Sequence, residues 1–444
     1  MPPDRENVLK AKTFAGIEIP PELKWSNFLN LYFIAFCAGS IVALPAVLQP
    51  AFLKDIINIP QEKAGIINSN LQNMSQIAWF LFVGIAGMFS DKVGRRILAI
   101  VGFIFCGISF ILFVYIKHIA LLIGMGSINE MVILTYITRF LLGIGIILAF
   151  PQTMTLVADY SYNKDRGKAM AYHGLTMSLG SILVFGVIAQ LGKKMGLSNL
   201  FYISAGIGFA GLFATLLGVV DRMPEQKPKK IGIKKIFDTV IEDIALVASY
   251  VTTFVSRIDI VIISTFVIVW MVKVADKFGM TSIQATMKGG IILLVMSVAT
   301  LLAWPIIGIL LDKWGRGQVM ILGLFLGGAG FTLIALTKNP FSSPMYLYTT
   351  LMGVGFSAAT ASASALTADA SPKPLLGSVM GGLNAMQPLG AFIFLFLGGI
   401  SFDKLGYWGP FALKGAVDIL CGIWILFIRK RLILSSRENR LKKA

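Results

Sequence analysis

The sequence predicts an all-α membrane protein in which twelve transmembrane helices form two pseudo-symmetric six-helix bundles. Three observations support this fold class. Of the 444 residues, 56% are hydrophobic and 14% are charged, whereas soluble domains carry about 25% charged residues. Long apolar segments recur along the whole chain. One charged loop pattern occurs twice, each time at the end of such a segment.

Each apolar segment has about the 20 residues that a helix needs to cross a bilayer. No long apolar run precedes the first of them, so we expect no cleaved signal peptide. The spans are expected at residues 27–50, 65–89, 97–117, 131–158, 168–191, 199–220, 244–272, 286–311, 318–337, 345–368, 375–401 and 410–428.

One long polar stretch, residues 221–243, divides the chain. Apolar residues within it, including Ile236 and Val240, fall at helical spacing beside lysines, which predicts an amphipathic helix on the membrane surface. The predicted organisation is an N-terminal tail (1–26), an N-terminal bundle (27–220), this linker (221–243), a C-terminal bundle (244–428) and a basic tail (429–444).

The net charge of +17 bears on partners and orientation. In a soluble protein this charge would suggest binding to nucleic acid. In a membrane protein we expect the basic loops to lie at the anionic cytoplasmic leaflet, so the partner is membrane lipid and not nucleic acid. Lys and Arg are concentrated in the tails, the linker and alternate loops. We therefore expect both termini in the cytoplasm, in the plasma (inner) membrane, and a monomer.

The two halves of the chain are related as repeats. An offset of 210 residues places Gly143 on Gly353, Asp159 on Asp369 and Gly180 on Gly390. Matches at one constant offset indicate that the two bundles share one architecture.

The repeated charged loop reads Gly87-x-x-x-Asp91-Lys92-x-Gly94-Arg95-Arg96 in the first half. In the second half it reads Gly308-x-x-x-Asp312-Lys313-x-Gly315-Arg316. The second glycine of each copy permits a backbone reversal between two helices, and the charges can pair across the turn or with helix ends. Together with Asp159 and Arg166, we expect these residues to form a cytoplasmic gate.

These motifs resemble the loop 2–3 signature of the major facilitator superfamily. Arg139-x-x-x-Gly143-x-Gly145 is similar to the helix 4 signature of this family. Asp159 with Arg166-Gly167 resembles the acidic–basic pair of its loop 4–5 region. The resemblance covers the whole chain, but the antiporter and sugar-porter signatures are missing, so no subfamily is assigned. It implies that helices 1, 4, 7 and 10 line a cavity and that transport proceeds by alternating access.

Ionisable side chains inside the spans are costly and therefore informative. Arg139 and Arg257 are expected to contact substrate, and Asp259 to carry a coupling proton; the alternative is that they form interhelical pairs or hydrogen-bonding hubs. Asp418, on the last helix, is expected to serve packing. The uncharged candidates are Gln152, Asn384, Gln387 and His173, with interhelical hydrogen bonds as the alternative.

The predicted function is secondary active transport of a small organic solute, with an anionic or zwitterionic metabolite favoured by the two intramembrane arginines. No P-loop is present, so we expect no ATP hydrolysis by this chain, no enzyme activity, no cofactor and no metal. Protons are the expected coupling partner. The alternatives are efflux of amphipathic, drug-like compounds and a non-transporting sensor of the same fold.

Overall fold

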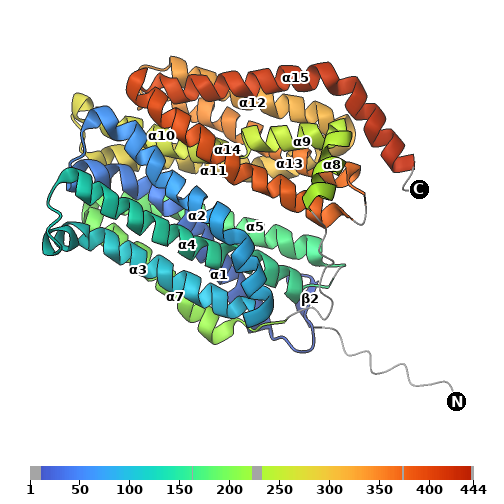
Figure 1. Cartoon of the computed structure of the whole chain (residues 1–444), viewed down its shortest axis with the longest axis horizontal. Coiled ribbons are helices and arrows are strands. Elements are labelled where there is room, and N and C mark those ends of the chain that lie inside the picture. The colour runs from blue at the N-terminus through green and yellow to red at the C-terminus, as the bar shows by residue number, and fades with distance from the viewer. Residues whose placement is uncertain (1–11, 163, 223–232, 373–374, 442–444) are drawn as a thin grey trace.

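The computed structural model describes residues 12–162, 164–222, 233–372 and 375–441, apart from the side chains of Asp91, Ile233 and 433–441. Twelve of its helical segments are long and apolar enough to cross a membrane. The predicted fold class is therefore confirmed, and Figure 1 shows the helices gathered into two bundles.

The N-terminal bundle consists of α1 (Trp25–Phe52), α2 (Ala64–Val93), α3 (Arg95–Leu122), α4 (Ile128–Tyr160), α5 (Arg166–Leu183) with α6 (Ala189–Met195), and α7 (Leu197–Gly218). Short helical pieces extend or join three of its helices: η1 (Leu53–Ile57) extends α1, η2 (Gln61–Lys63) precedes α2, and η3 (Val184–Ile188) joins α5 to α6.

The C-terminal bundle consists of α9 (Ile244–Ser256) with α10 (Asp259–Val274) and η4 (Ala275–Phe278), α11 (Ser282–Trp314), α12 (Arg316–Leu336), α13 (Pro344–Ala370), α14 (Leu376–Lys404) and α15 (Trp408–Leu441). Its first span is broken at Arg257 and Ile258, between α9 and α10. The last helix continues to Leu441, well past the expected limit at residue 428, because nothing in this basic stretch interrupts the helical backbone.

Two further elements lie at one membrane face. A hairpin of β1 (Thr13–Phe14) and β2 (Ile17–Glu18) precedes α1, and α8 (Ile233–Glu242) forms within the linker. Val240 of α8 is buried whereas Phe237 is 63% exposed. We call the face where α1 begins and α15 ends the terminal face, and the other the opposite face (Figure 1).

The internal repeat is visible in how the helices pack. A side chain at Gly180 of α5 would come within 2.3 Å of the Phe36 carbonyl oxygen of α1, and one at Gly390 of α14 within 2.1 Å of the Phe254 carbonyl oxygen of α9. Only glycine allows two backbones to approach so closely. The pair related by the 210-residue offset thus makes the same contact in both bundles.

Candidate functional site

The two signature turns have the same geometry. Gly94 joins α2 to α3 with φ of +107°, and Gly315 joins α11 to α12 with φ of +89°. The arginine after each glycine forms an ion pair with an acid in its own bundle: Arg95 with Asp159, and Arg316 Nε with Asp369 Oδ2 at 3.0 Å. These acids occupy equivalent positions at the ends of α4 and α13, so each pair ties three helices together at the terminal face.

The first turn carries a cap formed by Asp221. Asp221, just after α7, accepts a hydrogen bond from the Arg96 backbone amide at 2.9 Å, at the N-terminus of α3. Arg96 donates in turn to the Leu216 carbonyl at 2.7 Å. Gly317 stands at the position equivalent to Arg96, so the second turn cannot make this side-chain contact.

The remaining predicted gate residues make longer polar contacts or are exposed. Arg166 reaches the Ala158 carbonyl at 3.5 Å, and Arg316 also contacts Asp312 at 3.3 Å. Lys92 is exposed. The side chain of Asp91 lies outside the described part of the structure. Gly87 and Gly308 face open space, so neither is covered in this state and the gating role of these residues stays a prediction.

At the opposite face, polar contacts join the two bundles. Asp403 of α14 accepts hydrogen bonds from the backbone amides of Gly65 and Ile66, at 2.8 Å each, in the first turn of α2. Lys54 pairs with Asp276 at 2.7 Å, and Ser282 donates to Asp55 at 2.6 Å. An anion at a helix N-terminus is favourable, because the helix dipole and free amides both attract it.

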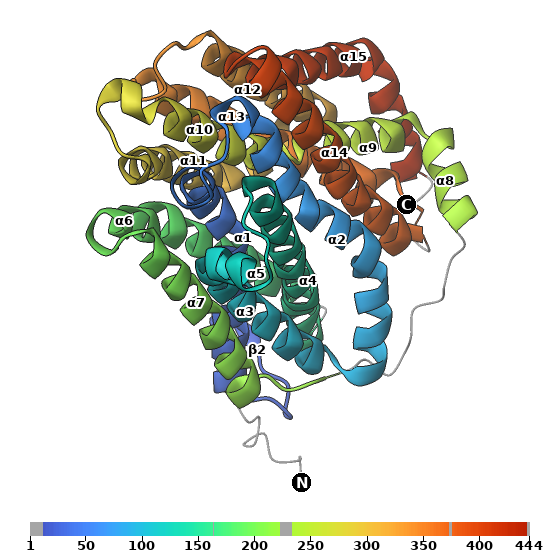
Figure 2. The same cartoon turned by 60° about the vertical axis from the view of Figure 1, so that its left-hand side comes forward.

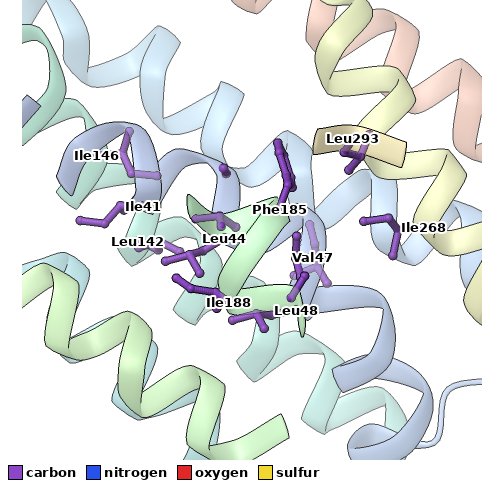
Figure 3. Close-up of a cluster of buried hydrophobic side chains, with 14 of the residues drawn as sticks. Ile41, Leu44, Val47, Leu48, Leu142, Ile146, Phe185, Ile188, Ile268 and Leu293 are labelled. Atoms are coloured by element: carbon purple, nitrogen blue, oxygen red, sulfur yellow. The ribbon is translucent and has the colours of Figure 1, made fainter. Parts of the chain in front are cut away.

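A cluster of buried apolar side chains lies where the two bundles meet (Figure 3). Its side chains come from both halves: Ile41, Leu44, Val47 and Leu48 of α1, Leu142 and Ile146 of α4, Phe185 and Ile188 of η3, Ile268 of α10 and Leu293 of α11. All are buried. Close packing of apolar side chains excludes water, so a solute cannot reach the opposite face through this cluster.

Toward the terminal face, α2 of the first bundle and α14 of the second separate. Helices α2 and α14 are in contact where Ser69 meets Gly399, and they diverge toward the other end (Figure 2). Open space surrounds Gly84 and Gly87 of α2 and Gly377 and Gly381 of α14. We call the region around these four glycines the vestibule. The described contacts between α2 and α14 thus lie toward the opposite face, with open space around the glycines nearer the terminal face.

Arg257 lies at the break in the first span of the C-terminal bundle. It is half-buried, and its guanidinium donates a hydrogen bond to the exposed Asn384 of α14. No ion pair to Arg257 is found among the described residues. Gln387, one turn further along α14, is also exposed. An arginine in the membrane with only a neutral amide as partner has unused capacity for an anion.

Asp259 lies two residues further on and has entirely different surroundings. Lys414 of α15 contacts its Oδ1 at 2.6 Å, and Lys414 also contacts Asp418, one turn along the same helix. The three side chains are only 1–2% exposed. Arg257 and Asp259 therefore have different partners, one facing α14 and the other enclosed within the bundle.

Arg139 of α4 is 2% exposed. It donates to Gln72 Oε1 of α2 at 2.8 Å, while its Nε and Nη1 have no hydrogen-bond partner in the described part of the chain. It lies about 17 Å along α4 from the opposite-face end, whereas Arg257 lies about 20 Å along its span from the terminal face. No described contact joins these two arginines, so the structure does not assemble them into one site in this state.

The other polar candidates are enclosed. His173 Nε2 of α5 lies 2.8 Å from Thr153 Oγ1 of α4, and Gln152 is buried with its Oε1 unbonded. Sequence reasoning missed Lys414, because it stands near the expected start of the last span, where a lysine can extend to the membrane surface. The signal that identifies it is its spacing of four residues from Asp418, which places both on one helix face.

The comparisons with known proteins agree with this architecture. The family model described as Major Facilitator Superfamily matches residues 31–272 and 249–443, nearly the whole chain. The chain is a member of the major facilitator superfamily. It is therefore a membrane transporter by family, not an enzyme, and the resemblance in the signature loops is confirmed.

Relatives within the superfamily have different names. The chain is 26% identical over 410 residues to the magnetosome protein MamH of Paramagnetospirillum magneticum, covering 92% of this chain and 94% of MamH. It is 27% identical to the magnetosome protein MamZ of Magnetospirillum gryphiswaldense, but spans only 64% of the length of MamZ. It is 21% identical over 387 residues to the multidrug resistance efflux pump PmrA of Streptococcus pneumoniae, covering 85% of this chain and 88% of PmrA.

Solved structures show the same fold. The nucleoside transporter NupG superposes with a TM-score of 0.71 at 12% identity, covering 91% of this chain and 99% of NupG. The inward-open xylose transporter XylE from E. coli superposes with a TM-score of 0.66 at 16% identity, covering 90% of this chain and 95% of XylE. At these identities the likeness concerns the fold alone.

Proposed function

We propose that this protein is a secondary active transporter of a small anionic or zwitterionic organic solute, working by alternating access and coupled to protons. The observation that carries the substrate class is Arg257. It lies at a helix break beside the vestibule, and its described partner is a neutral amide. Discontinuous membrane helices are common where transporters bind substrates and ions.

The guanidinium is suited to a carboxylate or phosphate group, because its planar fork donates two parallel hydrogen bonds to two oxygens. A bound anion would replace the Asn384 oxygen at Arg257, and the released amide and Gln387 would then be free to contact polar groups of the solute. Hydrogen bonds to charged groups contribute about 1.5–3 kcal/mol each. Arg139, buried and bonded only through one nitrogen, is a second anchor that a solute would reach in another state.

The same break links solute binding to the proposed proton site. Arg257 and Asp259 flank a single residue, Ile258, so a movement of Arg257 toward a solute is transmitted directly to the first turn of α10. Asp259 would then change its contact with Lys414 and gain or lose a proton.

The test is exchange and accumulation of labelled monocarboxylates, amino acids and phosphorylated metabolites in proteoliposomes. Arg257→Ala should lower apparent solute affinity at least about tenfold in exchange, since two charge-assisted hydrogen bonds are lost. Asp259→Asn should preserve exchange but abolish accumulation driven by a pH gradient. Arg431→Ala, which removes an exposed arginine of α15, is the matched control. Unchanged affinity in Arg257→Ala would reject the anion site.

Efflux of amphipathic compounds is the second candidate. Large apolar side chains are exposed on helices of both bundles, among them Phe80 of α2, Leu179 of α5 and Ile306 of α11. The relative PmrA is named a multidrug resistance efflux pump. Extrusion of a fluorescent hydrophobic dye that is unaffected by Arg257→Ala would favour this function over the first.

For location, we propose a monomer in the plasma (inner) membrane with both termini in the cytoplasm and with lipid and protons as its other partners. Because the relatives MamH and MamZ are named magnetosome proteins, a magnetosome membrane is the alternative. Fluorescence microscopy of a C-terminal fusion, together with light scattering of the purified protein, tests the membrane and the oligomeric state.

A further inference from the structure

The buried cluster of Asp259, Lys414 and Asp418 holds two acids for one base. Lys414 Nζ lies 2.6 Å from Asp259 Oδ1 and also contacts Asp418 Oδ1. The same Lys414 Nζ lies over the aromatic rings of Phe331 and Phe394, at 5.1 and 5.9 Å from the ring centroids. The cluster is therefore enclosed by four helices, α10, α12, α14 and α15.

No further charge balances the cluster among the described residues that face it. The neighbouring α12 contributes Gly327 and Phe331, and α14 contributes Phe394. On α15 itself the other titratable group nearby is the thiol of Cys421. With both carboxylates ionised, the cluster has a net charge of −1, and a buried unpaired charge is strongly unfavourable.

The second oxygens of the two acids turn toward one small space. A Cβ atom at Gly327 would lie 3.7 Å from Asp259 Oδ2 and 3.8 Å from Asp418 Oδ2. Asp418 Oδ2 is buried and has no hydrogen-bond partner among the residues that the structure describes. An unbonded carboxylate oxygen at this depth is stabilised when it binds a proton, because the acid then becomes neutral.

We propose that Asp259, Lys414 and Asp418 form a proton-binding site in which the two carboxylates hold one proton between them and Lys414 is the fixed counter-charge. The inference rests on the proposed transport function and deepens it by assigning Asp418 and Lys414 to the coupling site. One proton passes from a hydronium ion to a carboxylate oxygen: one O–H bond of hydronium breaks, leaving water, one O–H bond forms on the carboxyl group, and the cluster charge changes from −1 to 0. Release of the proton reverses these changes.

The site is sealed in the present state, because its members are only 1–2% exposed. Asp259 begins α10 directly after the break at Arg257 and Ile258. A movement at this break is the route by which Asp259 leaves Lys414 and reaches water. Exchange of the proton is thus tied to the same segment that the solute contacts.

The first experiment measures thermal stability between about pH 5 and pH 9 without any solute. The folded cluster keeps a proton that the same acids, exposed in the unfolded chain, have already lost, so stability falls as the pH rises. One excess proton corresponds to about a tenfold change in the unfolding equilibrium per pH unit. Asp418→Asn leaves one acid and one base in the cluster, so the pH dependence of stability should vanish. At the alkaline end of the range this variant should have a higher melting temperature than the parent.

The matched control is Glu62→Gln, an acid-to-amide change at an exposed residue, which should keep the parent's pH dependence. A purely structural ion pair gives the opposite result for Asp418→Asn: lower melting temperature at every pH and an unchanged slope. That outcome overturns the proposal. Should Asp418→Asn not fold, Asp259→Asn provides the same comparison from the other acid.

Infrared difference spectra of the parent protein provide a second measurement that needs no variant to fold. The C=O stretch of a protonated carboxylic acid should be present at neutral pH and disappear at alkaline pH; its absence throughout overturns the proposal. Repeating the titration with choline in place of sodium distinguishes a proton from a sodium ion. A stability that follows sodium concentration and not pH overturns the proton assignment.

These measurements separate the two proposals. If no solute is exchanged but the pH dependence follows the cluster, the proposed substrate class fails and the proton site stands. If exchange and accumulation occur with Asp418→Asn as in the parent, and its pH dependence is unchanged, the proton site fails and transport stands.

Discussion

Asp403 joins the two bundles at the opposite face, and replacing it should change which state the protein occupies. In Asp403→Asn the carboxylate that accepts from Gly65 and Ile66, at 2.8 Å each, becomes an amide with one acceptor oxygen. Hydrogen bonds to charged groups contribute about 1.5–3 kcal/mol, and Asp403 is half-buried. We therefore take about 2 kcal/mol, roughly a 30-fold shift toward the state that is closed at the terminal face.

Asp276→Asn is the matched control, since it makes the same chemical change at the same face. Asp276 is 75% exposed in its pair with Lys54, and exposed ion pairs contribute about 0.2–1 kcal/mol. Lys54 also keeps its hydrogen bond to the Val272 carbonyl at 3.0 Å. The shift should therefore be at most about fivefold.

The assay is the distance between spin labels on Met88→Cys of α2 and Leu376→Cys of α14, near the terminal-face ends of these helices. The native Cys37, Cys106 and Cys421 are buried, so labelling is selective. The fraction of short distances should rise strongly in Asp403→Asn and little in Asp276→Asn. If Asp403→Asn gave the parent's distance distribution, its carboxylate would not stabilise the present state and the reasoning would be refuted.

Three further predictions follow from particular contacts. Gly180→Ala and Gly390→Ala should each destabilise the protein by about 1–3 kcal/mol in thermal unfolding, because the new methyl group meets a carbonyl oxygen; Gly206→Ala, with open space around it, should not. Asp221→Ala should cost about 1 kcal/mol by uncapping α3, and an equal loss in Asp221→Asn would show that charge, not capping, is involved. Continuing the α2–α14 register from Gly65 and Asp403 places Gly87 opposite Gly381. The double variant Gly87→Cys with Gly381→Cys should therefore form a disulfide only when the terminal face closes, and this disulfide should block flux. Oxidation without loss of flux would contradict this expectation.

The sequence by itself determined the fold of this protein. Apolar segments of bilayer length leave few alternatives to membrane helices, because a helix satisfies its own backbone hydrogen bonds in lipid. The duplicated Gly94 and Gly315 turns identify the two halves, since each needs a backbone conformation that glycine adopts readily. The candidate residues Arg139, Arg257 and Asp259 could be selected from their cost in the membrane alone.

Only the tertiary structure decided which partners these residues have. Asp259 and Lys414 lie far apart in the chain and meet because α10 and α15 pack together, a pairing that no local periodicity encodes. Under the proposed alternating access, the contacts of Asp403 and the open space at Gly87 belong to one of at least two states. A single sequence must be compatible with every such state, so the choice between them lies in the balance of contacts between the two bundles.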